Sequence, residues 1–319
     1  MYASFKNGKL PKIAFGTWSW GAGDKNSGKT VFGNDYTSAD ALKPVFDLAY
    51  EQGYTLWDTA YVYDFGGAED LLRQCADGRD YFLSDKFTPL PGQTDGEVRR
   101  ILEGSLKRLN RDCMDLYWIH TPADVERWTK ELIPLLKEGL IRHVGVSNHS
   151  LYDIEYAQSV LQAAGYCISA VQNHCSLIYR NSIKSGVVDW CRRNGAVFMP
   201  YMILEQGALT GRFTSENPFP AESRRGRCFP PETLDALQPL VADMTALGKK
   251  HGGADASQIA MAWAISKGML PIIGATKKNH IQKAIDASTI VLSDEEMMDL
   301  EIAADRTGIS VRASWEKEM

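Results

Sequence analysis

Residues 114–148 decide the fold, because two hydrophobic patterns follow one another there. The stretch begins with Met114–His120 (MDLYWIH) and ends with His143–Asn148 (HVGVSN), two short runs of mostly apolar or small residues. Nearly continuous apolar runs are typical of parallel strands that are buried on both faces. Between the runs, Leu135 and Leu136 follow Leu132 at spacings of three and four, which places all three on one helix face. The stretch therefore predicts a strand, a helix and a second parallel strand.

The same alternation extends along the whole chain. Further apolar runs are Ile13–Trp18, Thr55–Ala60, Tyr81–Phe87, Ala170–Asn173, Val197–Met202 and Leu270–Ala275. Strand–helix units in strict alternation leave two candidates, a doubly wound sheet or a closed (β/α)8 barrel. No dinucleotide-binding glycine motif follows an early strand, because Gly21, Gly23 and Gly28 have the wrong spacing. We therefore predict an α/β fold, a single (β/α)8 TIM barrel domain over residues 1–319.

Additions are expected at both ends of the barrel. Asn7 and Gly8 lie between Ser4–Phe5 and Lys12–Ile13, which predicts an N-terminal β-hairpin that plugs the barrel floor. Ser293, with Glu296 three residues later, predicts an added C-terminal helix that ends near Arg306.

Two long segments fall outside the strand–helix rhythm. Ser19–Asp35 is a polar, glycine-rich loop after the first strand, and Phe213–Glu232 is a loop rich in proline and arginine after the seventh. Long loops at the C-terminal ends of barrel strands usually carry substrate contacts. The second loop contains Arg224, Arg225 and Arg227, which could clamp a cofactor phosphate or an anionic substrate. A solvated loop face is the interpretation that we favour for these arginines.

Composition narrows the class of protein. The net charge of -5, with no basic block beyond those arginines, gives no support to nucleic-acid binding. No apolar run is long enough to span a bilayer, and Met1–Leu10 lacks the hydrophobic core of a signal peptide. The six cysteines are scattered without paired spacing, which favours reduced thiols in the cytoplasm over disulfides or a metal site.

Polar residues gather where the second, third and fourth predicted strands end. Asp58, Lys86 and His120 come from these three strand ends, and Tyr63 follows in the loop after the second. Neighbouring parallel strands end at the same rim, so these side chains should meet there. Taken alone, each of these residues more commonly has a structural role. An Asp–Lys pair is usually a structural ion pair, a lone histidine is usually a hydrogen-bonded polar residue, and a loop tyrosine usually lies on the surface. Their joint position on the catalytic face of a barrel reverses that interpretation.

The four residues suit the reduction of a carbonyl group. A tyrosine hydroxyl such as that of Tyr63, with a pKa of about 10, keeps its proton at neutral pH and can donate it. An ammonium on Lys86 would lower that pKa, and Asp58 is the natural partner for a buried lysine. His120 can donate a hydrogen bond to the carbonyl oxygen as charge develops on it.

Tryptophans near the barrel mouth predict a flat, apolar or aromatic wall for the substrate. The residues predicted to contact substrate are Trp18, Trp20, Tyr63, Trp118 and His120. Strand alternation gives Trp118 the same face as His120 and turns Trp57 away from Asp58. Packing beneath helices is the alternative for several of these rings.

These motifs make the sequence recognisable. The runs Asp58–Tyr63 (DTAYVY), Ser84–Lys86 (SDK) and Trp118–His120 (WIH) resemble the signature of the aldo-keto reductases. Similarity continues at Gly16–Trp18, Gly145–Asn148, Val171–Asn173, Gly207–Gly211 and Gly274. The resemblance implies that Tyr63 is the proton donor, Lys86 and Asp58 tune it, and His120 orients the carbonyl.

The resemblance also implies an extended NADP(H), with NADH possible, across the barrel rim. Ser147, Asn148 and Gln172 would hold the nicotinamide carboxamide, and Tyr201 would stack on its ring. Residues of the Leu204–Arg212 segment would wrap the pyrophosphate. The full set implied to contact the cofactor is Gly16, Thr17, Trp18, Asp58, Ser147, Asn148, Gln172, Tyr201, Leu204, Gln206, Gly207, Leu209, Arg212, Gly274, Thr276, Lys277 and His280.

The sequence departs from the family pattern at the adenine end. His280 stands where an arginine is frequent, and Lys283-Ala284 replaces a frequent Glu-Asn pair. Lys277 and Lys278 could still meet a ribose 2′-phosphate electrostatically. Preference for NADP over NAD therefore stays open at this point.

The sequence predicts an NADP(H)-dependent oxidoreductase that reduces aldehyde or ketone groups of small or aromatic substrates. One alternative is an alcohol or sugar dehydrogenase that uses the same residues in reverse. Another is a nicotinamide-binding sensor or channel-associated subunit, since the short tail resembles the branch that includes pyridoxal reductases and potassium-channel β-subunits. A monomer and a homo-oligomer are both compatible with the sequence, and neither a membrane nor a nucleic-acid partner is expected.

Overall fold

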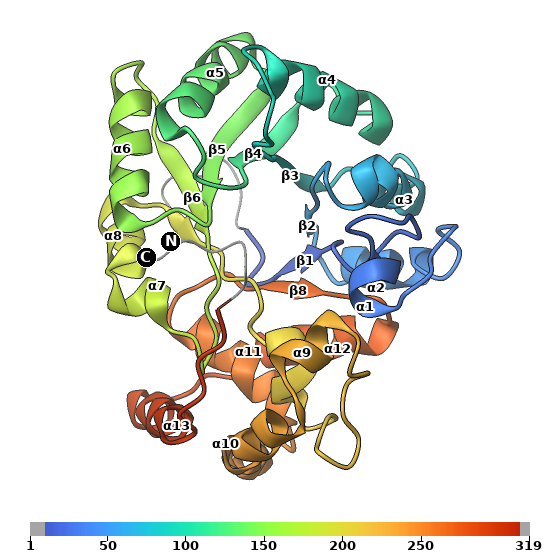
Figure 1. Ribbon diagram of the computed structural model, residues 1–319, viewed down its shortest axis with the longest axis vertical. Coiled ribbons are helices and arrows are strands. Elements are labelled where there is room, and N and C mark those ends of the chain that lie inside the picture. The colour runs from blue at the N-terminus through green and yellow to red at the C-terminus, as the bar shows by residue number, and fades with distance from the viewer. Residues whose placement is uncertain (1–9, 313–319) are drawn as a thin grey trace.

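A computed structural model describes residues 10–312 and contains eight parallel strands surrounded by helices (Figure 1). The strands are β1 (Ala14–Gly16), β2 (Leu56–Asp58), β3 (Phe82–Phe87), β4 (Met114–Ile119), β5 (Ile141–Ser147), β6 (Ile168–Gln172), β7 (Val197–Phe198) and β8 (Ile272–Gly274). They pair in sequence order from β1 to β7, and β8 pairs with β1. Every predicted strand is therefore present, and the prediction of a (β/α)8 barrel is confirmed.

Backbone hydrogen bonds between β7 and β8 close the sheet into a barrel. The N–H of Leu270 donates to the carbonyl of Phe198 at 3.0 Å, and that of Ile272 donates to Pro200 at 2.9 Å. Strand β7 is shorter than the predicted Val197–Met202, which is consistent with Pro200, because proline has no N–H to donate to a ladder. A doubly wound sheet would leave these two edges apart.

Helices form an outer ring around the barrel (Figure 1). The main ones are α2 (Lys43–Glu51), α3 (Gly67–Ala76), α4 (Glu97–Leu109), α5 (Val125–Glu138), α6 (Leu151–Gln162), α7 (Asn181–Lys184), α8 (Val187–Asn194), α10 (Pro231–Lys250), α11 (Ala256–Ser266) and α12 (Lys278–Ala287). The added helix α13 (Asp294–Arg306) begins as predicted, because Ser293 and Glu296 form a reciprocal capping box.

Strand alternation divides the core into two compartments. A small apolar cluster that includes Leu56, Leu116 and Trp118 fills the barrel, while Trp57 belongs to the larger layer between sheet and helices. Since Leu56 and Asp58 lie two residues apart on one strand, both side chains point inward. Alternation therefore aims Asp58 at the barrel axis, as predicted.

The two long loops each contain a short helix that the sequence did not predict. Helix α1 (Gly28–Phe32) lies in the first, and α9 (Arg224–Cys228) lies in the second. Most of the predicted N-terminal hairpin lies outside the described residues, but Leu10 packs against the cluster inside the barrel. Within residues 10–312, none of the helices combines the length and the apolar character that a membrane crossing requires.

Candidate active site

A cavity of about 930 Å³ opens at the C-terminal ends of the strands. Its wall includes three of the four predicted catalytic residues, namely Asp58, Tyr63 and His120. The fourth, Lys86, is completely buried beside them. The structure thus brings the four residues together at one place on the barrel rim.

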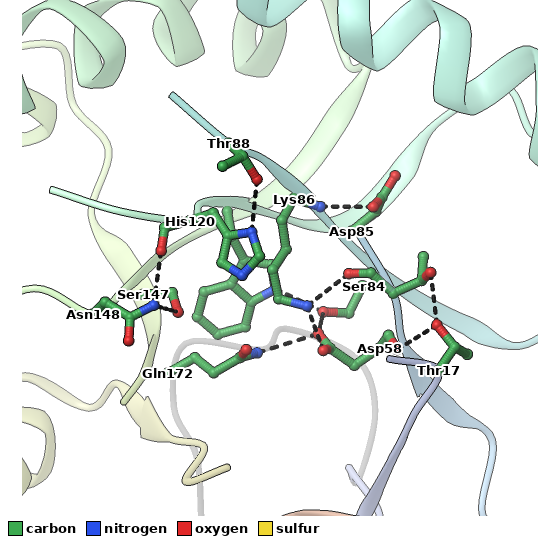
Figure 2. A network of polar contacts seen from close by, with 12 residues as sticks. Thr17, Asp58, Ser84, Asp85, Lys86, Thr88, His120, Ser147, Asn148 and Gln172 are labelled. Atoms are coloured by element: carbon green, nitrogen blue, oxygen red, sulfur yellow. Dashed lines mark hydrogen bonds and ion pairs between the residues drawn. The ribbon is translucent and has the colours of Figure 1, made fainter. Parts of the chain in front are cut away.

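Lys86 and Asp58 form a buried ion pair at the base of this site (Figure 2). The ammonium lies 2.5 Å from Oδ2 of Asp58 and donates to the carbonyl of Thr59 at 2.6 Å. The other carboxylate oxygen accepts from Ser84 Oγ at 2.6 Å and from Gln172 Nε2 at 3.2 Å. Burial is the largest single influence and opposes the charge on Lys86, but Asp58, Tyr63 and Asp85 together outweigh burial and hold the pKa of Lys86 above its usual value.

Tyr63 lies half-buried between Lys86, Trp18 and His120. Its ring centroid is 5.1 Å from the Lys86 ammonium, 6.2 Å from the Trp18 ring and 5.9 Å from the His120 ring. Burial raises the pKa of Tyr63 above its usual value, although the ammonium acts to lower it. The ammonium acts on this pKa in the predicted direction, and burial exceeds its effect. Tyr63 therefore keeps its proton at neutral pH.

His120 is held by a residue that the sequence reasoning missed. The Thr88 hydroxyl lies 2.7 Å from Nδ1 of His120 (Figure 2). Burial and the Lys86 ammonium hold the pKa of His120 well below its usual value, so the ring is neutral. We assign the Thr88 hydroxyl as donor to Nδ1, which leaves the ring proton on Nε2. His120 can then donate one hydrogen bond without carrying charge.

The residues predicted to hold a nicotinamide carboxamide also converge. Asn148 donates through Nδ2 to the His120 carbonyl at 2.9 Å and to Ser147 Oγ at 3.1 Å. The Tyr201 hydroxyl donates to Oδ1 of Asn148 at 2.6 Å. Gln172, whose amide reaches Asp58, joins this group to the catalytic ion pair. All four residues line the cavity.

The segment after β7 is wound tightly around a buried carboxylate. Met202, Glu205 and Gln206 all have left-handed backbone, with φ of 59°, 47° and 56°. Such non-glycine conformations cost about 1 kcal/mol or more each and persist where the surroundings enforce them. The Glu205 carboxylate supplies that enforcement, because it is fully buried and accepts from Ser176 Oγ and from His174 Nε2, the latter at 2.9 Å.

Basic residues line the far end of the cavity. Gly274, Thr276, Lys277 and His280 lie there as predicted, and Leu204, Gln206, Gly207 and Arg212 line the adjoining wall. Lys283 also lines the cavity and pairs with Asp255 at 2.5 Å. Burial and the neighbouring Lys277, Lys283 and Arg212 lower the pKa of His280, so its ring is neutral.

Several residues predicted to contact substrate or cofactor do not line the cavity, because their side chains lie beneath it. Trp20 is completely buried and donates from Nε1 to the Ala275 carbonyl at 2.8 Å. Trp118 points inward as predicted, but it fills the barrel and donates to Ser84 Oγ at 2.7 Å. Thr17 hydrogen-bonds Thr59 Oγ1 at 2.8 Å, and neither Thr17 nor the fully buried Leu209 lines the cavity. Of the three tryptophans predicted to contact substrate, Trp18 alone lines the cavity. Gly16, predicted to contact the cofactor, lines it as well.

The favoured interpretation of the arginine loop is also wrong for two of its three arginines. Arg224 and Arg225 line the cavity, half-buried, whereas Arg227 is exposed. The Arg224 guanidinium lies 5.5 Å from the Trp18 ring. Arg225 donates to the carbonyl of Phe32 at 3.1 Å, which joins the two long loops above the cavity.

The first loop is tied to the catalytic segment by Asp64, which follows Tyr63. Its Oδ2 accepts from the backbone N–H groups of Ala22 and Gly23, both at 3.1 Å. A Cβ on Gly23 would lie 1.8 Å from Oδ1 of Asp64, so only glycine fits there. The position of the first long loop therefore depends on Asp64, which directly follows the predicted proton donor Tyr63.

The cavity wall also offers buried polar atoms that a bound molecule could satisfy. Among the described residues, Ser19 Oγ and Gln206 Oε1 are buried without a hydrogen-bond partner, and both residues line the cavity. Buried polar groups without partners are costly unless something satisfies them. With Arg212 and Lys277 beyond them, the wall fits an elongated anionic molecule with hydrogen-bonding groups.

The chain resembles known oxidoreductases along most of its length. The chain is 28% identical over 312 residues to the chloroplastic pyridoxal reductase of Arabidopsis thaliana, covering 92% of this chain and 82% of the relative. It is 28% identical over 297 residues to the NADP(+) aldo-keto reductase yakc of Schizosaccharomyces pombe, covering 86% and 85% of the two chains.

Solved structures show the same likeness. An aldo/keto reductase from Klebsiella pneumoniae in complex with NADP and acetate superposes with a TM-score of 0.71 at 25% identity, covering 92% of this chain and 91% of that one. Glycerol dehydrogenase from Gluconobacter oxydans has the same fold, with a TM-score of 0.81 at 23% identity over 96% of this chain and 95% of its own. The sequence model of the aldo/keto reductase family matches residues 12–305, and the chain belongs to that family.

Proposed function

We propose that the protein is an NADP(H)-dependent reductase that converts aldehyde or ketone groups of small or aromatic molecules to alcohols. One observation carries the proposal, the meeting of Tyr63, Lys86, Asp58 and His120 beside a single cavity of about 930 Å³. Relatives named as an NADP(+) aldo-keto reductase and as a pyridoxal reductase support it.

His120, Tyr63, Lys86 and Asp58 each have a separate role in the proposed reduction. NADPH, when bound, supplies the hydride to the carbonyl carbon. His120, neutral and held by Thr88, donates a hydrogen bond to the carbonyl oxygen and so orients it. Tyr63 donates its hydroxyl proton to that oxygen, and the Lys86 ammonium stabilises the resulting phenolate. Asp58 keeps Lys86 charged and in place.

At neutral pH the free site holds Tyr63 in the protonated form that reduction requires. Oxidation of an alcohol would need Tyr63 as a base, in its phenolate form. Burial raises the pKa of Tyr63 above its usual value, so the protonated form dominates near pH 7. The same site would run as a dehydrogenase only at high pH or with a large excess of oxidised cofactor.

Residues along the cavity suit NADP(H). Ser147, Asn148 and Gln172 would hold the carboxamide, and Arg212 and Lys277 would meet phosphate groups. Lys283 pairs with Asp255 and His280 is neutral, so Lys277 carries most of the charge toward a 2′-phosphate. A cytoplasmic location is part of the proposal, because all six cysteines are free thiols, as a reducing compartment requires.

The test is the substitution Tyr63→Phe, assayed by NADPH oxidation with a panel of aldehydes. We expect the rate of reduction to fall by about 100-fold to 10,000-fold, because only the proton donor is lost. NADPH affinity, measured by fluorescence titration, should stay within about twofold. Tyr61→Phe is the matched control, since Tyr61 does not line the cavity, and it should keep full activity.

Near-native turnover in Tyr63→Phe would overturn the role of Tyr63. NADPH binding with no turnover of any carbonyl by the wild type would favour a cofactor-binding sensor instead.

A further inference from the structure

The side chains that line the cavity carry an excess of positive charge. Among the described residues that line it, Asp58 is the only carboxylate, and Lys86 neutralises it. Against this one acid, the wall carries Arg212, Arg224 and Arg225, together with Lys277 and Lys283. A concave, partly desolvated surface of one sign concentrates ligands of the opposite sign.

These cations form two groups. Arg212, Lys277 and Lys283 act together on His280 at the far end, where phosphate groups of a cofactor would lie. Arg224 lies elsewhere. Its guanidinium is 5.5 Å from the Trp18 ring, and that ring is 6.2 Å from the ring of Tyr63. Trp18 is therefore a neighbour of both the Arg224 guanidinium and the predicted proton donor.

Arg224 is positioned by its surroundings rather than extended into solvent. It is half-buried on the short helix α9, which Ser223 caps by accepting from the N–H of Gly226 at 3.0 Å. Burial lowers the pKa of Arg224 below its usual value, which reflects the cost of holding this charge out of water. A guanidinium remains charged nonetheless, and a ligand carboxylate would offset that cost.

We infer that the physiological substrate carries an anionic group, a carboxylate or a phosphate, that binds Arg224 while its carbonyl lies at Tyr63 and His120. This inference rests on the proposed reductase function. The aromatic ring of Trp18 lines the space between the two anchors, so a short or planar spacer between carbonyl and anion fits best. Arg224 is a specificity-determining residue, because it acts on substrate binding and not on the bonds that change.

The test compares 3- and 4-carboxybenzaldehyde with their uncharged methyl esters at saturating NADPH. We expect wild-type kcat/KM to favour the carboxylates by about tenfold or more, chiefly through KM. Arg224→Met keeps the aliphatic stem over Trp18 and should abolish that preference while kinetics with the esters and the Kd for NADPH stay unchanged. Arg227→Met, on the same helix but exposed, should keep the wild-type preference.

Equal kcat/KM for acids and esters in the wild type would overturn the inference. So would a preference that survives Arg224→Met, or a large rise in the NADPH Kd of that variant, which would assign Arg224 to the cofactor. If no carbonyl compound is reduced, the reductase proposal fails. Binding of benzoate, measured by calorimetry, then tests the anion subsite at Arg224 independently of turnover. Benzoate binding that is lost in Arg224→Met supports an anion subsite, and absence of benzoate binding to the wild type refutes it.

Discussion

Strand β3 carries two consecutive buried ionisable residues, Asp85 and Lys86, and places them in opposite environments. Lys86 points toward the cavity side and pairs with the carboxylate of Asp58. Asp85 points to the other face, away from the ammonium, and its Oδ1 accepts from the backbone N–H of Lys86 at 2.7 Å (Figure 2). Strand alternation alone separates the two side chains.

The outer environment contains a pair of carboxyl groups. Burial raises the pKa of Asp85 well above its usual value, and the negative charge of the neighbouring Glu69 carboxylate raises it further. Glu69 is fully buried on α3 and forms an ion pair with Arg108 of α4. The Arg108 guanidinium also lies 5.1 Å from the ring of Tyr61, two residues before Tyr63.

The comparison teaches what buried charge does on each side of the sheet. Inside, an opposite charge keeps Lys86 ionised beside the reacting groups. Outside, burial and the Glu69 charge keep Asp85 protonated, while Arg108 pairs with Glu69 and packs on the ring of Tyr61. We propose that the inner pair serves catalysis and the outer cluster serves stability, and three substitutions test that division.

The largest effect should follow from Lys86→Met. We expect kcat for carbonyl reduction to fall by about 1,000-fold, because the phenolate of Tyr63 loses its stabilising charge. Loss of the ammonium also raises the pKa of Tyr63 further. In the alcohol-oxidation direction, where Tyr63 must be deprotonated, activity should therefore rise only at higher pH than in the wild type. A pH profile of residual oxidation that matches the wild type would show that Lys86 is structural.

Arg108→Met should instead affect stability. Removing the partner of a buried carboxylate costs about 3 kcal/mol, because the remaining charge is left uncompensated. We expect the free energy of unfolding in urea to fall by about that amount, while kcat of the folded protein stays within about tenfold of wild type.

Arg100→Met is the matched control on the same helix. Arg100 is exposed and pairs with Glu97 on the surface, so its loss should reduce stability far less than the loss of Arg108. Equal losses of stability in the two variants would contradict the special role of the outer cluster.

The smallest effect should come from Asp85→Asn and should appear as a change in pH dependence. Because the pKa of Asp85 is raised in the folded chain, the folded state keeps a proton that the unfolded state loses above about pH 4. This residue therefore makes stability fall as pH rises. Asparagine cannot ionise, so the stability of the variant should fall less steeply than that of the wild type between pH 5 and pH 7.

Urea unfolding at several pH values measures this difference. Asp80→Asn is the control, because Asp80 is 96% exposed, and its pH dependence should follow the wild type. An Asp85→Asn variant with the wild-type slope would mean that Asp85 is ionised in the folded chain.

The fold and the catalytic residues could be predicted because their signals are periodic and local. Apolar runs gave all eight strands, and position at strand ends gave Asp58, Lys86 and His120. Strand alternation predicts that Trp118 points into the barrel, but it does not predict how far below the cavity the ring lies. Trp118 packs inside the barrel and does not line the cavity as predicted.

Loop residues left no such signal. From the sequence, Arg224 and Arg225 are expected to be solvent-exposed charges in a loop. Contacts between the two long loops bring them to the cavity. Glu205 likewise reads as an exposed residue of a turn. Its burial depends on His174 and Ser176, about thirty residues earlier in the chain. Interactions between distant segments cannot be inferred from the spacing of residues within one of them.

Gly145 on β5 constrains which sequences this barrel can reach by mutation. A Cβ there would lie 2.2 Å from the indole of Trp118, whose N–H anchors Ser84 and, through it, the carboxylate of Asp58. Any side chain at position 145 would displace a rigid ring and, through two hydrogen bonds, the partner of Lys86. Among descendants of this sequence that keep the same chemistry, positions 118 and 145 should therefore change together or remain fixed.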